Sequence, residues 1–362
     1  MTSIFDASAM AALRKELALD PYLIRGLRNR LLKRFLADSE AMGDFPEPQR
    51  LVLHCLELHR RCDSEIDGAT KLLFRTVAGL LIESVILRIA SGRTTLCISS
   101  QVGCAAACDF CATGRMGIAQ NLSAVEMLDQ VLQAGQILTS EQRRMQNIVF
   151  MGMGEPFHNE ENLHEVLEIL TDARQFDRSP GSLLVSTVGI PEAMVRCARR
   201  FPRVNLALSL HSVDPEIRKA IIPLAVKYPL QDLKAAIVEV NRLQSVPLMI
   251  EYLMLKNCND SVNQAQELAA WVMGLNVHIN LIPFNPIEDA PHLAGSAREV
   301  IEDFSRTLKH AGLKVTIRYS LGTDIAAACG QLVRNENRQR PPGHSPASRL
   351  NDGAPTIHEA SN

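Results

Sequence analysis

Three cysteines, Cys104, Cys108 and Cys111, share one short stretch of the chain with the spacing C-x3-C-x2-C. Structural zinc usually takes four protein ligands, commonly two separated cysteine pairs, and neither a second pair nor a nearby pair of histidines accompanies this stretch. Three thiolates on one loop instead match three irons of a [4Fe-4S] cluster and leave the fourth iron open to a small molecule. A three-cysteine zinc loop and a redox-sensing group of thiols are the alternatives.

Glycine and polar residues follow several of the expected strands. Gly154 and Glu155 lie in MGMGEP, directly after the apolar run NIVF, where glycine permits a close backbone approach and positive φ. Hydroxyl, imidazole and amide groups at later strand ends suit a ribose and an amino-acid carboxylate. Taken singly, each is more typical of a turn or a cap. These candidates, in STVG, ALSLHS and LIPFNP, are Ser186, Ser209, His211 and Asn285.

Two cysteines and one glutamate outside the three-cysteine stretch complete the candidates. Cys97 precedes the stretch in CISSQVGC, and Cys329 lies far downstream in GTDIAAACGQL. Isolated cysteines are usually buried and behave as small apolar residues. The simplest interpretation of Cys97 and Cys329 is therefore that both are such buried thiols. Glu83, in LLIESVIL, is on the plain interpretation an exposed strand residue. No role is expected for Cys55, Cys62, Cys197 or Cys258.

The expected secondary structure changes at about residue 80, from mainly helical to alternating strands and helices. Before it, LIRGLRNRLLKRFL and QRLVLHCLELHRRC have helical spacing, which indicates a small helical domain over residues 1–79. Its basic side chains either bind RNA or are simply solvated. From 80 to 333, short apolar runs alternate with longer helical stretches, as in successive βα units. The polar, proline-rich residues 334–362 are expected to be disordered.

An incomplete (β/α) barrel fits this alternation best, although a doubly wound sheet would show the same pattern. In either arrangement, catalytic and binding residues lie just beyond the carboxyl ends of the strands, and the candidate residues are expected there. Strands are expected at 95–100, 147–151, 183–187, 204–210, 247–255, 277–283 and 314–320. Helices are expected at 123–138, 159–173, 190–200, 230–243, 263–274 and 298–312.

The bulk composition narrows the class of protein. A chain of 362 residues with 46% hydrophobic residues can bury a large core. No apolar run approaches the roughly 20 residues that cross a bilayer, so no membrane partner is expected. Nine cysteines, an odd number, are unlike a secreted disulfide framework and favour a cytoplasmic location. With a net charge of −2, the chain has no overall excess of basic residues of the kind that binds nucleic acid. An RNA substrate therefore needs a basic patch on one face of the protein.

The motifs together resemble a known family. CAAACDFC is similar to the CxxxCxxC signature of the radical S-adenosylmethionine (SAM) superfamily, with Phe110 before the last cysteine. MGMGEP resembles the segment with which these enzymes hold the amino group of SAM. The stretch from residue 71 to 333 is similar to one branch of that superfamily, the RlmN/Cfr family of dual-specificity RNA methyltransferases.

This resemblance implies an architecture and cofactors. The fold would be α/β, a partial (β/α)6 TIM-like barrel of the radical SAM type, with a small, mainly helical N-terminal accessory domain. Cys104, Cys108 and Cys111 would hold a [4Fe-4S] cluster, and SAM would be both methyl donor and radical source. The SAM contacts would be Gly154, Glu155, Ser186, Ser209, Leu210, His211 and Asn285.

The resemblance also implies a reaction. Cys329 would take a methyl group from one SAM, and a radical from a second SAM would remove hydrogen from the resulting S-methylcysteine. The carbon would add to an adenosine of 23S rRNA or tRNA, Glu83 would remove the ring proton, and Cys97 would attack the sulfur of Cys329 to release the product. The expected partners are this RNA and an electron donor such as flavodoxin or ferredoxin, and the protein is expected to be a monomer.

Some alternatives stay open at this point. Leu321, before the glycine of GTDIAAACGQL, is closer to the Cfr form, but one residue does not decide between methylation at C2 and at C8. A radical SAM reaction on another nucleic acid or on a small molecule would need neither Cys97 nor Cys329. A zinc-binding RNA-interaction module without catalysis is the alternative from another class.

Overall fold

A sheet of ten strands forms the centre of the protein. The computed structural model describes residues 1–43, 45–117 and 120–332. The strand order is β14-β13-β12-β11-β10-β9-β6-β5-β4-β3, in which β6 and β9 to β14 pair in parallel and β3, β4 and β5 are antiparallel. The strands are β3 Glu57–Asp63, β4 Ala69–Arg75, β5 Leu81–Arg88, β6 Thr94–Cys97, β9 Asn147–Phe150, β10 Leu183–Thr187, β11 Asn205–Ser209, β12 Leu248–Met254, β13 Val277–Pro283 and β14 Lys314–Ile317.

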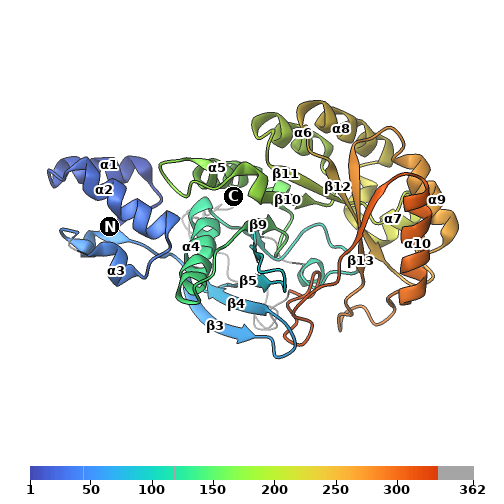
Figure 1. Ribbon diagram of the computed structural model, residues 1–362, viewed down its shortest axis with the longest axis horizontal. Helices are drawn as coiled ribbons and strands as arrows, with labels where there is room; N and C mark the ends of the chain where they lie inside the picture. The colour runs from blue at the N-terminus through green and yellow to red at the C-terminus, as the bar shows by residue number, and fades with distance from the viewer. Residues whose placement is uncertain (44, 118–119, 333–362) are drawn as a thin grey trace, which may run out of the picture.

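Helices connect the parallel strands and cover the outside of the sheet (Figure 1). They are α4 Ala124–Ser140, α5 Glu160–Thr171, α6 Pro191–Arg200, α7 Pro215–Ile221, α8 Leu230–Leu243, α9 Val262–Trp271 and α10 Arg298–His310. Parallel strands joined in this way are the βα units of a TIM-type barrel. The predicted α/β fold, with its strands and connecting helices, is therefore confirmed. No helix within the described part of the chain has both the length and the apolar character to cross a membrane.

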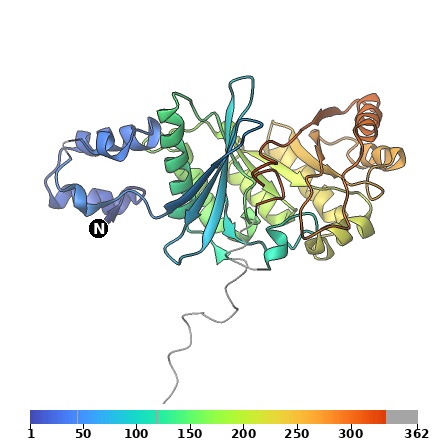
Figure 2. The same ribbon diagram turned by 90° about the horizontal axis from the view of Figure 1, so that it is seen from below.

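The N-terminal helices form a separate region beside α4, at one end of the molecule (Figures 1 and 2). They are α1 Ala7–Glu16, α2 Pro21–Arg28, which continues as a π turn over Asn29–Lys33, and α3 Asp38–Met42. Two small strand pairs lie outside the main sheet: β1 Thr2–Ser3 with β2 Leu51–Val52, and β7 Gln101–Val102 with β8 Gln120–Asn121.

A half-buried histidine, His54, links this helical region to α4. The Nδ1 atom of His54 lies 2.6 Å from Oδ1 of Asp129, and its Nε2 atom lies 3.0 Å from Oδ2 of Asp38. Burial opposes the charged form of His54, but the hydrogen bonds to the two carboxylates outweigh it and raise its pKa to about 9. The histidine is therefore a cation between two anions at neutral pH.

The helix expected over QRLVLHCLELHRRC is wrong, because most of this stretch forms β2 and β3. Strand β3 pairs with β4 in a hairpin whose turn is closed by Ser64 Oγ, which accepts from Asp67 N, and by Asp67 Oδ1, which accepts from Ala69 N. Turn chemistry and strand pairing thus override the helical spacing. The main sheet begins at Glu57, so a division at residue 79 would cut it. The tail expected at 334–362 lies outside the described residues.

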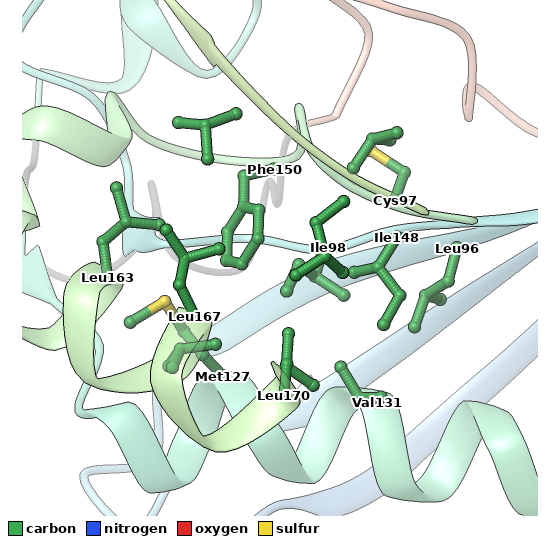
Figure 3. Packing of buried hydrophobic residues seen from close by; sticks show 14 of the residues in the cluster. Leu96, Cys97, Ile98, Met127, Val131, Ile148, Phe150, Leu163, Leu167 and Leu170 are labelled. Carbon is green, nitrogen blue, oxygen red and sulfur yellow. The ribbon is translucent and has the colours of Figure 1, made fainter. Parts of the chain in front are cut away.

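The alternation of side chains along β6 decides which residues enter the core. Leu96 and Ile98 pack with Val131 of α4 and Leu170 of α5 on the outer face of the sheet (Figure 3). Cys97, between them in sequence, lies on the opposite side of the strand in the same view. Because successive strand residues point to opposite faces, the apolar packing against the helices directs Cys97 into the barrel.

Candidate active site between two cavities

A cavity of about 140 Å³, the upper cavity, is lined largely by residues at the carboxyl ends of the parallel strands. Cys104, Cys108 and Cys111 line it from the loop that follows β7. The strand ends and the C-terminal segment supply further predicted residues to the same wall. These are Gly154, Glu155, Ser186, Ser209, His211 and Cys329.

The backbone of the cysteine loop is tightly folded. Ala107 has φ +52°, and the backbone of Gly114 approaches so closely that an added Cβ would lie 2.8 Å from Cys108 N. Burial raises the pKa of the Cys104 thiol to about 12 and also raises the pKa values of Cys108 and Cys111. A metal centre bound by these groups would displace their protons.

The arrangement of thiols fits a cluster. Within residues 1–43, 45–117 and 120–332, no three His, Cys, Asp or Glu side chains are grouped so that they could hold one metal ion. A zinc ion needs its ligands to converge on one point, whereas a [4Fe-4S] cluster takes each thiolate on a different iron. Cys104, Cys108 and Cys111 line a single cavity, from which each could offer a thiolate to a different iron.

Gly154 and Glu155 form a polar corner of the upper cavity. Gly154 has φ +107°, and an added Cβ would lie 2.6 Å from the Cβ of Gln101, so only glycine fits. The Glu155 carboxylate accepts hydrogen bonds from Val188 N (2.8 Å) and Phe157 N (3.0 Å). Burial raises its pKa to about 7, so a cationic ligand beside it would restore the charged form.

His211 is held in a fixed orientation at the wall of the upper cavity. Its Nδ1 atom accepts a hydrogen bond from Leu253 N at 3.1 Å, so the proton of the neutral ring is on Nε2. Burial, helped by the charge of Arg218, lowers its pKa to about 3. The ring meets Phe110 edge to face, with 4.9 Å between the centroids, which places the imidazole next to the cysteine loop.

Ser186 and Ser209 share one partner that the sequence analysis did not single out. Both hydroxyl groups donate to Oε2 of Glu251, at 3.0 and 3.4 Å. Glu251 is buried on β12 and lines the upper cavity. The signal in the sequence was an acidic residue inside the apolar run PLMIEYLML, where an unpaired charge would be costly.

Two of the predicted SAM contacts, Leu210 and Asn285, are not among the residues that line the upper cavity. The Leu210 side chain is fully buried in the apolar core. Asn285 lies behind the wall, where its amide nitrogen donates to Ser320 Oγ at 2.9 Å and to the Cys329 carbonyl at 3.1 Å. In this structure Asn285 therefore holds the segment that carries Cys329.

A second cavity of about 630 Å³, the inner cavity, lies inside the barrel. Met151 and Cys329 line both cavities, so they form the wall between them. Leu87 of β5 and Thr95 of β6 line the inner cavity. Because side chains alternate along each strand, Glu83 and Cys97 point to the same face as these two residues.

Cations lie beside acidic and thiol groups that face the interior of the barrel. The Arg318 guanidinium lies 3.8 Å from Glu251 and 3.7 Å from the Met151 sulfur. Burial, followed by the charge of Cys329, raises the pKa of Cys97 to about 12, while Arg318 acts in the opposite direction. The Lys71 ammonium lies 3.7 Å from the Glu83 carboxylate. The sequence analysis missed Lys71 and Arg318.

The comparisons with known proteins agree with this geometry. Residues 98–268 match the model of the radical SAM superfamily. The chain is 60% identical to a probable RNA methyltransferase of Rhodopirellula baltica, over 93% of this chain and 89% of that protein. It is 38% identical to the dual-specificity RNA methyltransferase RlmN of Ruthia magnifica, over 86% of this chain and 89% of that one.

A solved structure supports the same assignment. The crystal structure of a radical SAM methyltransferase from Sphaerobacter thermophilus superimposes with a TM-score of 0.86 at 36% identity, over 92% of this chain and 99% of that one. A further relative, a probable RlmN of Thermus thermophilus, is 41% identical over 74% of this chain and 75% of its own length. The predicted resemblance is thus confirmed, and the chain belongs to the RlmN family of radical SAM RNA methyltransferases.

Proposed function

We propose that this enzyme methylates a ring carbon, C2 or C8, of an adenosine in 23S rRNA or tRNA through an S-methylcysteine at Cys329. One observation carries the proposal: Cys329 forms part of the wall between the upper cavity and the inner cavity. A thiol in this place can be loaded from one side and unloaded from the other. The names of the relatives, RNA methyltransferases, support the substrate class.

The upper cavity is proposed to hold the cofactors. Cys104, Cys108 and Cys111 would bind a [4Fe-4S] cluster, and the buried Glu155 carboxylate would bind the amino group of SAM. Gly154, Ser186, Ser209 and His211 supply the remaining wall, and Leu210 could take part only through its backbone. When bound, these groups would supply a methyl group and a 5′-deoxyadenosyl radical.

The groups that face the interior of the barrel are proposed to complete the transfer of the methyl group to RNA. Cys329 would accept the methyl group, which requires thiolate character, and Arg318 lines the inner cavity together with it. After the methyl-derived carbon has bonded to the ring, Glu83 would take the ring proton. Cys97, as a thiolate, would then bond to the sulfur of Cys329 as the carbon–sulfur bond breaks, and the methylene carbon would take that electron pair and a proton to become the methyl group. The unpaired electron would pass to an acceptor such as the oxidised electron donor, and a reductant would reset the resulting disulfide.

The partners and the location are proposed from the same assignment. The enzyme would work in the cytoplasm as a monomer and take electrons from a donor such as flavodoxin or ferredoxin. The helical region is the proposed accessory domain for RNA. Two of its basic residues already have partners, because Arg30 Nε donates to Ala41 O and Lys33 lies 3.1 Å from Asp177. Arg25 and Arg34 are exposed, whereas Arg28 is half-buried, so a basic RNA face there would depend on Arg25 and Arg34.

Mapping of adenosine methylation by mass spectrometry in rRNA and tRNA tests the proposal. Cells with the intact gene, without it, and with Cys329→Ala should be compared. We expect one methylated adenosine, at C2 or C8, that is present only with the intact gene. Methylation that persists with Cys329→Ala, or a modified base other than adenosine, would contradict the proposal.

A further inference from the structure

A buried lysine on β4 lies beside the proposed base. Lys71 is 7% exposed, although lysine is almost never fully buried unless it is paired. Its Nζ atom lies 3.7 Å from Oε2 of Glu83, which is 0% exposed. Apolar neighbours Leu72, Leu73 and Phe74 follow it along the strand, so the charge is placed within the core of the sheet.

The register of the sheet sets this placement. Lys71 pairs with Val85 of β5, and Val85 pairs with Cys97 of β6. Residues directly opposite one another in neighbouring strands point to the same face. Lys71, Glu83 and Cys97 therefore all face the interior of the barrel, and Lys71 approaches Glu83 diagonally across the β4–β5 pair.

The same lysine holds the segment that carries Cys329. The Lys71 ammonium donates to the carbonyl of Ala326 at 3.2 Å, three residues before the cysteine. Ala326 itself has φ +49°, a backbone conformation that needs support from its surroundings. One side chain thus contacts both the proposed base and the peptide segment that carries the methyl-bearing thiol.

The β3–β4 hairpin makes further contacts with this segment. Asp67 Oδ2 accepts from Gly322 N at 2.8 Å, and Ser64 Oγ donates to Asp324 at 2.8 Å. These contacts hold the segment but do not include Glu83. The hairpin therefore offers two positions to compare: Lys71 contacts both Glu83 and the segment, whereas Asp67 contacts the segment and its own turn but not Glu83.

A buried carboxylate stays ionised only when charge or hydrogen bonds compensate for the loss of water. A base must also lie within hydrogen-bond reach of the proton that it removes. Lys71 supplies a cation at 3.7 Å from Glu83 and fixes the carboxylate relative to the Ala326 carbonyl. Lys71 thus meets the first requirement and also links Glu83 to the segment that carries Cys329.

We propose that Lys71 is a positioning residue that keeps Glu83 charged and in place for proton removal next to Cys329. The proposal rests on the proposed function, in which Glu83 is the base. In the step concerned, the C–H bond of the adenine ring breaks, the proton passes to a Glu83 oxygen, and the electron pair stays in the ring. Lys71 itself exchanges no proton or electron in this step.

The test compares Lys71→Met with Lys71→Arg and Asp67→Ala in the reconstituted holoenzyme. Its readouts are S-methylation of Cys329, deoxyadenosine formation, and the amount and lifetime of the covalent enzyme–RNA adduct. With Lys71→Met, adduct resolution should slow by about tenfold to about a hundredfold, the loss expected from a misplaced catalytic group. Deoxyadenosine formation should stay near the wild-type level, S-methylation should fall no further than it does in Asp67→Ala, and Lys71→Arg should restore most of the resolution rate.

An isotope effect separates positioning from simple loss of structure. RNA with adenosine deuterated at both ring carbons should show a larger kinetic isotope effect on adduct resolution with Lys71→Met than with wild-type enzyme. This ratio does not depend on how much of the variant is folded. Asp67→Ala should lower S-methylation if the segment loosens, but it should leave the isotope effect at the wild-type value.

Two failures can be told apart. If Lys71→Met resolves the adduct at the wild-type rate with an unchanged isotope effect, or if Lys71→Arg rescues nothing, the role of Lys71 is wrong while the proposed function stands. If the wild-type holoenzyme forms no adduct with RNA at all, the proposed function itself is wrong. An equal loss of all three readouts in Lys71→Met and Asp67→Ala would assign Lys71 only to the fold.

Discussion

The upper cavity and the inner cavity are built in different ways. Cys104, Cys108 and Cys111 come from one loop, so a short stretch of sequence places three groups on the same wall. The groups facing the interior come from β4, β5 and β6 and from the segment around Cys329, and only the register of the sheet brings them together. Binding of a cofactor can thus be encoded locally, whereas the transfer chemistry depends on the whole fold.

The electrostatic environments of the two cavities differ as well. Burial raises the pKa of Cys104 and of Glu155 in the upper cavity, so these groups release protons when a cationic partner binds. On the interior side, Arg318 and Lys71 already stand beside Glu251 and Glu83. The first region is prepared for an added ligand, and the second is prepared for acid–base and thiol chemistry.

The largest effect should come from the residue shared by both cavities. Cys329→Ala should abolish RNA methylation, because the acceptor of the methyl group is gone. Iron content and deoxyadenosine formation should persist, since the other lining residues of the upper cavity are unchanged. Cys62→Ala, on the edge strand β3, is the matched control and should keep full activity. Loss of the cluster in Cys329→Ala would show that the two cavities are not separable.

Cys97→Ala should leave an enzyme that starts the reaction and cannot finish it. Without the second thiol no disulfide can form, so a covalent protein–RNA adduct should accumulate to nearly one per active enzyme. Denaturing gel electrophoresis with radiolabelled RNA measures this adduct. Free methylated RNA released at the wild-type rate from this variant would contradict the role of Cys97.

Glu83→Gln should slow the same stage without stopping it. Removal of a general base typically costs about 10²-fold to 10⁴-fold in rate. Rapid-quench measurement of adduct decay should show this loss, while S-methylation of Cys329 stays near normal. A variant that loses S-methylation instead would place Glu83 in the structure of the segment and not in proton removal.

Glu251→Gln tests whether one residue serves both cavities. This carboxylate accepts from Ser186 and Ser209 in the upper cavity and faces Arg318 towards the interior. We expect both SAM cleavage and RNA methylation to fall by about tenfold to about a hundredfold, a range typical of groups that orient ligand-binding residues. An effect on only one of the two activities would show that Glu251 serves a single cavity.

The smallest effect on catalysis should come from a change outside both cavities. The pKa of His54 is raised from 6.5 to about 9 in the folded protein, so its stabilising contribution is complete below pH 6.5 and is lost as the pH rises through 9. Because the His54 side chain is 25% exposed, solvent screening makes the stabilisation smaller than the full pKa shift would give. Thermal unfolding from pH 6 to pH 10 should show this decline, and His54→Gln should flatten it. In His54→Gln, any change in SAM cleavage should be matched by an equal change in RNA methylation.

The sequence predicted the parallel strands because each is a short apolar run between helices, and it predicted the cysteine loop because the spacing is local. It did not predict the β3–β4 hairpin, because the turn contacts of Ser64 and Asp67 outweigh the helical spacing. Lys71 and Glu251 were missed for a related reason. Each is one charged residue within an apolar strand, and its partner is identified only by pairing with distant strands.

The central claim is that the methyl group passes through the thiol between the two cavities. Holoenzyme should be loaded with SAM that carries a trideuterated methyl group and then turned over once with RNA, and Cys329 and the product followed by mass spectrometry. The account predicts that Cys329 carries the trideuterated methyl group before turnover and that the RNA methyl group keeps two deuterium atoms. A fully deuterated methyl group in the RNA, with Cys329 unlabelled throughout, would contradict it.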